Sequence, residues 1–480
     1  MNQARNAAGA QPRDATDPEL ADIARLGYIY GLPSYEVARL RYRALSLPRK
    51  GEPLRLNAFW HTKTLSTPAT SDVTAVNSDT LLSRAWIDLS RGPLLIHVPD
   101  TADRYYSIAL MDFFTNNFAV VGRCTTGTKA VSFFLAGPRW NGVAPGGAMT
   151  IRSPTNAVWA LVRFLVDGPA DLAAVRGLQE QLSISRPAAQ AGAGPPIRDP
   201  LSLPVLPFDG TKPLIFFDVL NAILTENPPP EEDSAILDRL RTIGVGPALH
   251  FDRRAFNEAQ LGALRRGIAA GREALAAQVA FRTRGPRAMP PRWPSDRLLD
   301  QLRGPVETAP EQPQPRRRAG WSGPVGKVGD FGTDYLLRAQ CALAGLGLLP
   351  REEAMYFTTA TDAAAAPLSG ITRHLLRFPP GGLPPVDAFW SLTIYQTDAN
   401  NRRWLVPNAI DRYSIGNRKS DLRYGSDGSL EIFIQHDPPA GNEDNWLPAP
   451  AGAFLLTLRA YQPRRELLDG TYEIPDVQRR

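Results

Sequence analysis

Proline and glycine are the residues that most restrict the folds open to this chain. The 480 residues include 45 prolines and 39 glycines. Proline lacks the amide hydrogen that a helix or sheet interior needs, and glycine loses the most conformational entropy in a regular element. A chain of this length also exceeds what one small core organises, so about two to four domains are expected. We therefore expect domains built mainly from short strands with long connections.

Short apolar runs bounded by turn residues predict two groups of strands, within residues 77–167 and within residues 371–462. Their spacing is typical of antiparallel sheets or sandwiches. Apolar residues at helical spacing precede the first group, at residues 17–43, and occur again between the two groups. In the first of these helices, Gly31-Leu32-Pro33 is expected to cause a kink or an interruption.

The order of these patterns predicts an α+β, β-rich fold with two antiparallel β-sandwich-like modules joined by a helical middle region. The expected divisions are a disordered N-terminus at 1–16, a β-rich module with an N-terminal helix at 17–185, Pro-rich linkers and the helical middle at 186–345, and a second β-sandwich module at 346–480.

Charge and motif content argue against several classes of partner. The net charge is +6, but the arginines are dispersed or lie in Pro-rich segments such as the one that holds Arg316-Arg317-Arg318. A nucleic-acid binder usually gathers basic residues on one face with aromatics between them, so no nucleic-acid partner is expected. No GxGxxG or GxxxxGK[ST] pattern occurs, which argues against a nucleotide site.

Metal ions and other cofactors are likewise not expected. Cys124 and Cys341 are far apart, and the five histidines form no HExxH or HxH pair. No apolar run approaches the roughly 18 residues of a membrane span. The first sixteen residues have no apolar core of a signal peptide, so the chain as written is expected in the cytoplasm, or in the periplasm or outside the cell if a signal peptide was removed.

Motif runs in the N-terminal half and in the C-terminal third resemble two families of bacterial proteins. In the N-terminal half they include Gly27-Tyr28-Ile29-Tyr30-Gly31, Asn77-Ser78-Asp79-Thr80-Leu81, Ala85-Trp86-Ile87-Asp88-Leu89, Asp103-Arg104-Tyr105-Tyr106, Gly122-Arg123 and Ser153-Pro154-Thr155-Asn156. In the C-terminal third they include Phe389-Trp390-Ser391-Leu392-Thr393-Ile394-Tyr395, Pro407-Asn408-Ala409-Ile410-Asp411-Arg412-Tyr413, His436-Asp437-Pro438-Pro439 and Asn445-Trp446-Leu447-Pro448-Ala449-Pro450.

The first set resembles DUF1254 and the second resembles DUF1214. The resemblance implies a two-module architecture, and it carries no assigned reaction. The chain departs from the usual pattern at Val76-Asn77 and Leu81-Leu82-Ser83, where the family has a Pro-Asn pair and a Tyr-Ser pair. Any role of that tyrosine hydroxyl is therefore missing here.

Two residues are candidates for acid–base chemistry. His436 ends a strand pattern just before Asp437-Pro438-Pro439, so its imidazole is expected at a sheet rim, where ligands are often bound. Asp79 belongs to a polar stretch that could form a pocket wall. The alternative for Asp79 is a turn in which Asn and Asp side chains bond their own backbone. His61 is a second-choice histidine, and for every histidine a structural role is the commoner case.

Seven further residues are candidates for ligand binding. Arginines with neighbouring aspartates recur in Asp103-Arg104-Tyr105 and Asp411-Arg412-Tyr413, an echo too short to establish an internal duplication. Each arginine could clamp a carboxylate or phosphate, or could pair with its aspartate and staple a loop. Trp446, followed by two prolines, could be a rigid platform for a sugar ring or a plug of the sandwich. The candidates are Asn77, Arg104, Tyr105, Trp390, Arg412, Asn445 and Trp446.

The leading hypothesis is a soluble protein that binds a small organic or carbohydrate-like molecule in a cleft between the two modules. Hydrolase or lyase chemistry without metal or nucleotide would fit such a site. The competing hypothesis is a non-enzymatic binding or structural module, with a homo-oligomer as one option, in which the motif residues serve packing.

Overall fold

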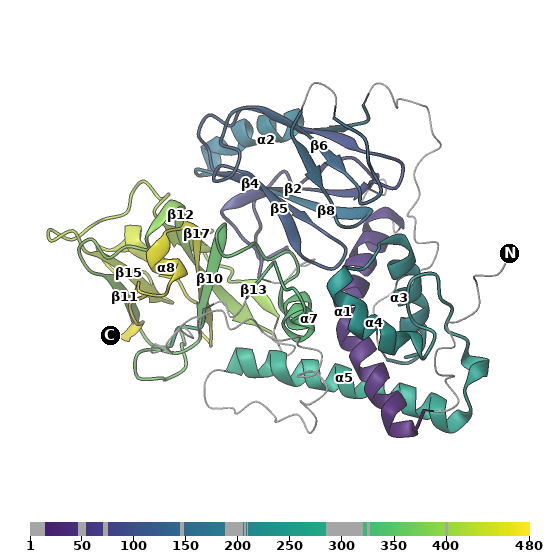
Figure 1. The fold of residues 1–480 in the computed structure, drawn as a ribbon. Coiled ribbons are helices and arrows are strands. Elements are labelled where there is room, and N and C mark those ends of the chain that lie inside the picture. The colour runs from purple at the N-terminus through teal and green to yellow at the C-terminus, as the bar shows by residue number, and fades with distance from the viewer. Residues whose placement is uncertain are drawn as a thin grey trace.

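The computed structural model describes residues 15–46, 54–70, 75–144, 148–187, 205, 208, 210–284, 320–323, 327–398 and 402–480. The N-terminal stretch expected to be disordered lies outside these ranges except for its last two residues, and the Pro-rich segment 285–318 lies wholly outside. Two β-rich modules and a group of helices lie around a common centre (Figure 1). The α+β class with two sheet-rich modules and a helical middle is confirmed.

The N-terminal module is a sandwich of two sheets. One sheet has the order β1-β2-β8-β4-β5 and the other β7-β6-β3-β9. Their inner faces share one apolar core that includes Ile96, Ile108 and Val162. Helix α2 (Leu172–Gln181) follows the last long strand. The strands are β1 (Trp60–His61), β2 (Thr80–Asp88), β3 (Leu94–Val98), β4 (Tyr106–Met111), β5 (Asn117–Gly122), β6 (Val131–Ala136), β7 (Thr150–Arg152), β8 (Ala157–Leu165) and β9 (Ser183–Ser185).

The C-terminal module is a second sandwich. Its larger sheet runs β10-β17-β12-β13, with β14 also paired to β12, and its smaller sheet runs β16-β15-β11-β18. Its core includes Leu376, Trp390 and Ile432. The elements are β10 (Ala354–Thr359), β11 (His374–Phe378), β12 (Val386–Thr397), β13 (Arg403–Leu405), β14 (Ser414–Gly416), β15 (Leu430–Gln435), β16 (Trp446–Pro448), β17 (Leu455–Pro463), α8 (Arg465–Leu468) and β18 (Gln478–Arg479).

The helices form a third unit that packs on the outer face of the N-terminal module. They are α1 (Asp17–Ser46), α3 (Ile215–Glu226), α4 (Ser234–Arg241), α5 (Glu258–Arg284) and α7 (Tyr335–Ala344). Helix α1 runs without a break through Pro33, so the interruption considered at residues 31–33 does not occur. Gly27 and Gly31 explain part of this, because a Cβ on either would meet Leu240, Phe217 or Leu220 of the neighbouring helices within about 3 Å. Close packing with those helices stabilises α1 despite its proline.

The two β-modules have the same topology. In chain order, β2 to β8 correspond to β10 to β17, with β13 and β14 together in the place of β5. Each smaller sheet contains one parallel pair at its edge, β6 with β7 and β15 with β16, among antiparallel neighbours. Each module ends with a helix and a short edge strand, α2 and β9 or α8 and β18. We conclude that the chain contains an internal structural duplication.

The registers identify equivalent residues in the duplicated modules. Ser107 pairs with Arg163 across β4 and β8, and Ser391 pairs with Arg459 across β12 and β17. At the end of each of the strands β8 and β17, a backbone amide donates to the carbonyl oxygen of an acidic residue. Val166 N, just after β8, donates to Asp79 O at 3.0 Å, and Gln462 N, near the end of β17, donates to Glu353 O at 2.9 Å.

Gly122 and Gly416 give a further sign of the duplication. A Cβ on Gly122 would lie 2.6 Å from the Tyr106 carbonyl oxygen, and one on Gly416 would lie 2.1 Å from that of Trp390. The same close strand approach is therefore present in both modules.

The outer faces of the two larger sheets meet each other and the helices in one continuous core. At the centre of the contact, Tyr105 of the N-terminal module packs edge-on against Phe389 and Tyr461 of the C-terminal module. Phe389 and Tyr461 stack with ring centroids 4.2 Å apart. Because these rings are 1–3% exposed, apolar burial contributes to holding the modules together.

Candidate functional site

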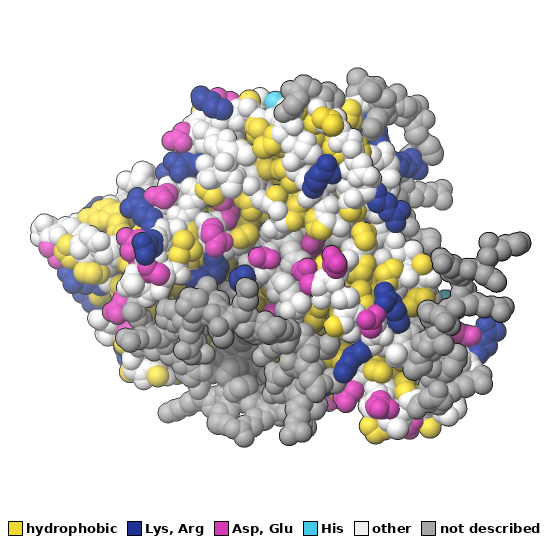
Figure 2. Space-filling model, in the orientation of Figure 1, with side chains coloured by type: hydrophobic (Ala, Val, Ile, Leu, Met, Phe, Trp, Pro, Cys, Tyr) yellow, Lys and Arg dark blue, Asp and Glu magenta, His cyan; other side chains and the backbone are white. Residues whose placement is uncertain are grey.

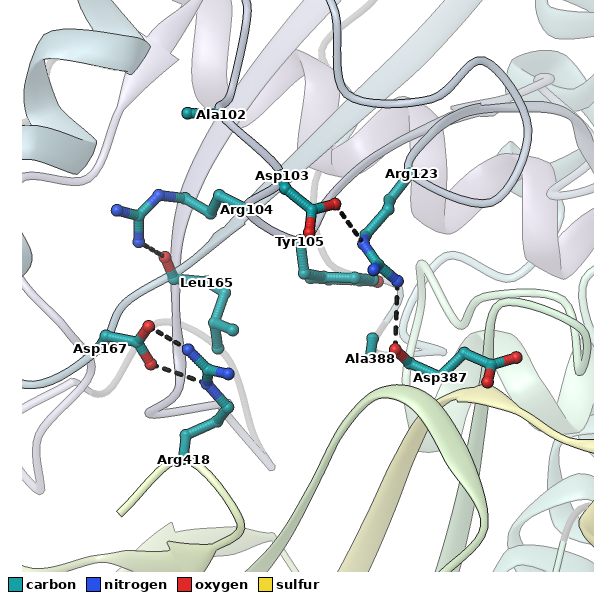
Figure 3. A pocket seen from close by; sticks show the side chains of 10 residues that line it. All are labelled: Ala102, Asp103, Arg104, Tyr105, Arg123, Leu165, Asp167, Asp387, Ala388 and Arg418. Carbon is teal, nitrogen blue, oxygen red and sulfur yellow. Dashed lines mark hydrogen bonds and ion pairs between the residues drawn. The ribbon is translucent and has the colours of Figure 1, made fainter. Parts of the chain in front are cut away.

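A pocket of about 360 Å³ opens between the two modules (Figure 3). The loop that precedes β4 and the first residues of the equivalent strand β12 both line it, so equivalent positions of the duplicated modules face the same space. Counted back from Ser107 and Ser391, Asp103 is equivalent to Asp387 and Arg104 to Ala388. The lining residues are Ala102, Asp103, Arg104, Tyr105, Arg123, Leu165, Asp167, Asp387, Ala388 and Arg418.

Arg104 forms one side of the pocket and is fixed by three contacts. Its Nη1 and Nη2 bind both carboxylate oxygens of Asp171 at 2.5 and 2.8 Å, and Nη1 also donates to the Leu165 carbonyl at 2.8 Å. Burial acts to raise the pKa of Asp171, but hydrogen bonds from Arg104 and from the Asp167 amide outweigh it, and the pKa is lowered. Arg104 therefore presents a rigid guanidinium whose charge is matched by a carboxylate.

Two other arginines join the modules at the edges of the pocket. Arg123 of the N-terminal module donates from Nε to Asp103 at 3.3 Å, and from Nη1 to the Asp387 carbonyl at 3.1 Å and to Gln462 Oε1 at 3.0 Å. Arg418 of the C-terminal module binds both carboxylate oxygens of Asp167. Figure 3 shows these contacts on opposite sides of the cavity. Each arginine thus links one module to the other.

Tyr105 contributes its ring to the pocket and its hydroxyl to a buried polar group. The hydroxyl lies 2.6 Å from Oε1 of Glu353, a residue 2% exposed, and 3.3 Å from Ser107 Oγ. The Cys124 thiol lies 3.1 Å from the other carboxylate oxygen. Burial raises the pKa of Glu353, and burial beside this carboxyl raises the pKa of the Cys124 thiol to about 12. A carboxyl group with a raised pKa therefore lies directly behind the pocket wall.

Asn77 and Asp79 lie at the module contact but are not among the residues that line the pocket. The Asn77 side chain donates to the Tyr461 hydroxyl and accepts from the Asp79 amide, which is the turn geometry considered for this stretch. Asp79 accepts hydrogen bonds from Ser391 at 2.6 Å and Ser414 at 2.8 Å. Asp79 and Glu353 hold equivalent positions, and each is bound by side chains of the opposite module. Both carboxyls thus fasten the two modules together.

The other candidates lie within the C-terminal module. Asn445 bonds backbone atoms of Arg423 and Glu431, and Trp446, which is 8% exposed, donates its indole N–H to the Gln435 carbonyl. Arg412 donates to the carbonyls of Glu443 and Trp446. His436 is exposed, and its Nδ1 lies 3.0 Å from the Ala449 carbonyl.

This second group is a rim cluster of loops around β15 and β16, apart from the pocket between the modules. Trp390 is part of the sandwich core at 1% exposed. His61 binds Ser83 on the edge of the N-terminal sheet, and burial lowers its pKa. Of the candidates, the structure therefore brings Asn77, Asp79, Arg104 and Tyr105 to the module contact, and places only Arg104 and Tyr105 in the pocket wall.

Sequence reasoning missed most of the pocket. Arg123 had a signal, because it belongs to the Gly122-Arg123 motif, but its partners in the other module, Asp387 and Gln462, are far away in the chain. Asp167, Asp387 and Arg418 stand in no motif, and Arg418 lies 251 residues from Asp167, its ion-pair partner. Glu353 belongs to the stretch before β10, whose equivalence to the Asp79 stretch becomes visible only through the strand registers.

On the face shown in Figure 2, basic and acidic side chains of the described residues are interspersed, and they form no large patch of one charge. Within the described ranges, no three His, Cys, Asp or Glu side chains are grouped so that they could hold a metal ion. None of the helices in those ranges combines the length and apolarity that crossing a membrane requires.

Comparison with known proteins gives the family but no activity. A model described as a protein of unknown function (DUF1254) matches residues 56–186, and one described as a protein of unknown function (DUF1214) matches residues 353–465. No curated protein matches. The crystal structure of the VPA0106 protein from Vibrio parahaemolyticus is similar over 96% of this chain and 100% of its own, with a TM-score of 0.69 and 22% identity. A putative uncharacterized protein from Burkholderia cenocepacia shares 13% identity over 96% of this chain and 87% of its own, at a TM-score of 0.44.

Proposed function

We propose that this chain, which belongs to the proteins that combine a DUF1254 and a DUF1214 module, binds a small organic or carbohydrate-like molecule in the pocket between the two modules. The observation that carries the proposal is the pocket itself, because equivalent positions of both modules line it, and arginine and aspartate side chains surround it. Ligand sites commonly form at domain interfaces, with a few convergent polar groups beside apolar walls. Ala388 supplies most of a small apolar wall here, because Tyr105 and Leu165 beside it are 3% and 4% exposed.

The proposal concerns binding. Asp79 and His436, the residues singled out for acid–base chemistry, lie outside the ten lining residues. Every carboxylate in the lining is engaged with an arginine, since Asp103 binds Arg123, Asp167 binds Arg418, and Asp387 binds Arg464 at 2.7 Å. The rim cluster around His436 fits the competing structural role, because its amide, indole and guanidinium groups are bonded to backbone atoms.

A metabolite screen with a pocket-blocking variant tests the proposal. The purified protein is screened for compounds that raise its melting temperature, since a ligand stabilises the folded state by mass action. Ala388→Trp places a large ring in the pocket wall and should abolish the shift. Ala364→Trp, in an exposed loop of the C-terminal module, is the matched control and should retain it. The proposal fails if no compound gives a shift, or if both variants respond as the wild type does.

A further inference from the structure

We infer that the pocket takes a neutral molecule with adjacent hydroxyl groups, a polyol or a small neutral carbohydrate, and selects against charged analogues of the same size. This inference rests on the proposed function, and it adds the chemical class of the ligand. It follows from how the charges of the pocket are paired.

The lining carries equal numbers of the two charges, with Arg104, Arg123 and Arg418 against Asp103, Asp167 and Asp387. Each of these arginines is bound to an aspartate. Two partners lie outside the lining, Asp171 for Arg104 and Arg464 for Asp387, and their negative and positive charges also cancel. The site therefore holds no uncompensated charge for an ionic ligand to neutralise.

An ionic ligand would have to break one of these pairs. An anion that bound Arg418 would compete with Asp167 for the same guanidinium group. A cation would meet three guanidinium groups. Separating one of these pairs leaves a charge without its partner. The cost is largest for Arg104 and Asp171, whose side chains are 19% and 16% exposed, and smaller for Arg418 and Asp167 at 45% and 39%. Like-charge contacts add to the discrimination.

A neutral ligand with hydroxyl groups can use the hydrogen-bonding capacity that the pairs leave over. Arg418 binds Asp167 through Nε and Nη2, and Arg123 uses Nε and Nη1. Nη1 of Arg418 and Nη2 of Arg123 form no hydrogen bond with the residues that the structure describes. Each paired carboxylate oxygen also retains a lone pair. Donors and acceptors thus lie side by side, and a hydroxyl group serves as both.

The size of the pocket and its mainly polar lining fit the same class. The cavity of about 360 Å³ is near the lower end of the roughly 300–1,000 Å³ typical of ligand pockets. Tyr105 and Leu165 are only 3% and 4% exposed, so Ala388 supplies most of the small apolar part of the lining. A small molecule whose surface consists mainly of hydroxyl groups matches both features.

Titration with matched sets of ligands tests the inference. The sets are neutral monosaccharides and cyclitols, the uronates and the amino sugars that share their skeletons, measured by calorimetry and ligand-observed NMR at about 50 and 500 mM salt. We expect a neutral member to bind at least tenfold more tightly than its charged analogues. Its affinity should be nearly independent of salt, because binding changes no net charge. The inference is overturned if a charged member binds more tightly, or if no member of the sets binds.

Charge-neutralising variants give a second readout. Asp167→Asn leaves the Arg418 cation without its partner, so the preference should move toward the uronate by about tenfold. Arg418→Gln leaves the Asp167 carboxylate and should move it toward the amino sugar. Asp238→Asn, which removes an exposed ion pair with Arg241 on α4, is the control and should change neither. Unchanged preferences in the first two variants would contradict the charge argument.

Failure of the inference can be told apart from failure of the proposed function. If charged members bind and Ala388→Trp abolishes that binding, the ligand class is wrong while the pocket remains a binding site. If the unbiased metabolite screen also gives no response that Ala388→Trp removes, the proposed function falls with it.

Discussion

Replacing Asp112 by asparagine should change the way in which the stability of the protein depends on pH. Asp112 is 2% exposed in the turn between β4 and β5. Its Oδ1 accepts the amides of Phe114 at 2.8 Å and Asn116 at 2.9 Å, and its Oδ2 accepts Asn116 Nδ2 at 3.1 Å. Burial raises the pKa of this carboxyl from 3.8 to about 6, although the bonds from Asn116 act in the opposite direction. Asparagine keeps the Oδ1 acceptor and carries no charge.

The sign and the size of the effect follow from linkage. Because the pKa is higher in the folded state, Asp112 contributes stability below pH 3.8 that is lost as the pH rises through about 6. The difference of about two pKa units corresponds to about 3 kcal/mol at 1.36 kcal/mol per unit. The free energy of unfolding of Asp112→Asn should therefore rise relative to wild type between about pH 4 and pH 7, by about 3 kcal/mol, and then stay level.

Urea denaturation of both proteins at pH values from about 4 to 8 measures this difference directly. Asp100→Asn is a useful control, because hydrogen bonds from the Ala102 amide and from Lys129 lower the pKa of that exposed carboxyl, so its difference should run in the opposite direction. A difference for Asp112→Asn that is flat, or that falls as the pH rises, would refute the account of a carboxyl destabilised by burial.

Three further outcomes are expected. Phe389→Ala removes a ring 1% exposed and stacked on Tyr461, and should lower the free energy of unfolding by about 3–5 kcal/mol in denaturant titrations. Gly177→Ala should stabilise α2 by about 0.5–1 kcal/mol, because a Cβ there meets nothing within 4 Å. Gly416→Ala should instead destabilise the protein, because its Cβ would lie 2.1 Å from a carbonyl oxygen. Thermal melts of the two variants compare these effects. Iodoacetamide should alkylate Cys124 slowly at pH 8, since its thiol has a pKa of about 12, and Glu353→Gln should speed the reaction by removing the neighbouring negative charge. Equal rates in the two proteins would rule out that influence, and Cys124→Ser identifies the signal.

Sequence patterns were sufficient to predict the classes of the elements because each depends on local chemistry. Alternating apolar residues predict a strand over Leu430 to His436, and β15 ends one residue earlier, at Gln435. The prolines and glycines predicted short strands with long connections for the same reason. Pro33 shows the limit of local reasoning, since its cost to α1 is offset by packing against helices more than 180 residues away in the chain.

The pocket was harder to predict because its residues meet only through the arrangement of the modules. The repeated Asp-Arg-Tyr stretches suggested a relation between Arg104 and Arg412. The registers instead make Ala388 the residue equivalent to Arg104, and Arg412 lies near β14. The modules are duplicated, but the two matching Asp-Arg-Tyr stretches do not occupy equivalent positions in them. Equivalent positions are held instead by pairs such as Ser107 and Ser391, or Gly122 and Gly416. These pairs can be recognised only from the strand pairing, which the sequence does not display.

The duplication also determines how a ligand can be oriented. In a pair of identical chains, a pocket between them would look the same from both sides, and an unsymmetrical molecule could bind in either of two equivalent directions. Here the two modules belong to one polypeptide, so their sequences can differ at equivalent positions. Arg104 of one module and its equivalent in the other, Ala388, both line the pocket. The two directions therefore differ in energy, and a molecule with distinct ends would occupy the pocket in one of them.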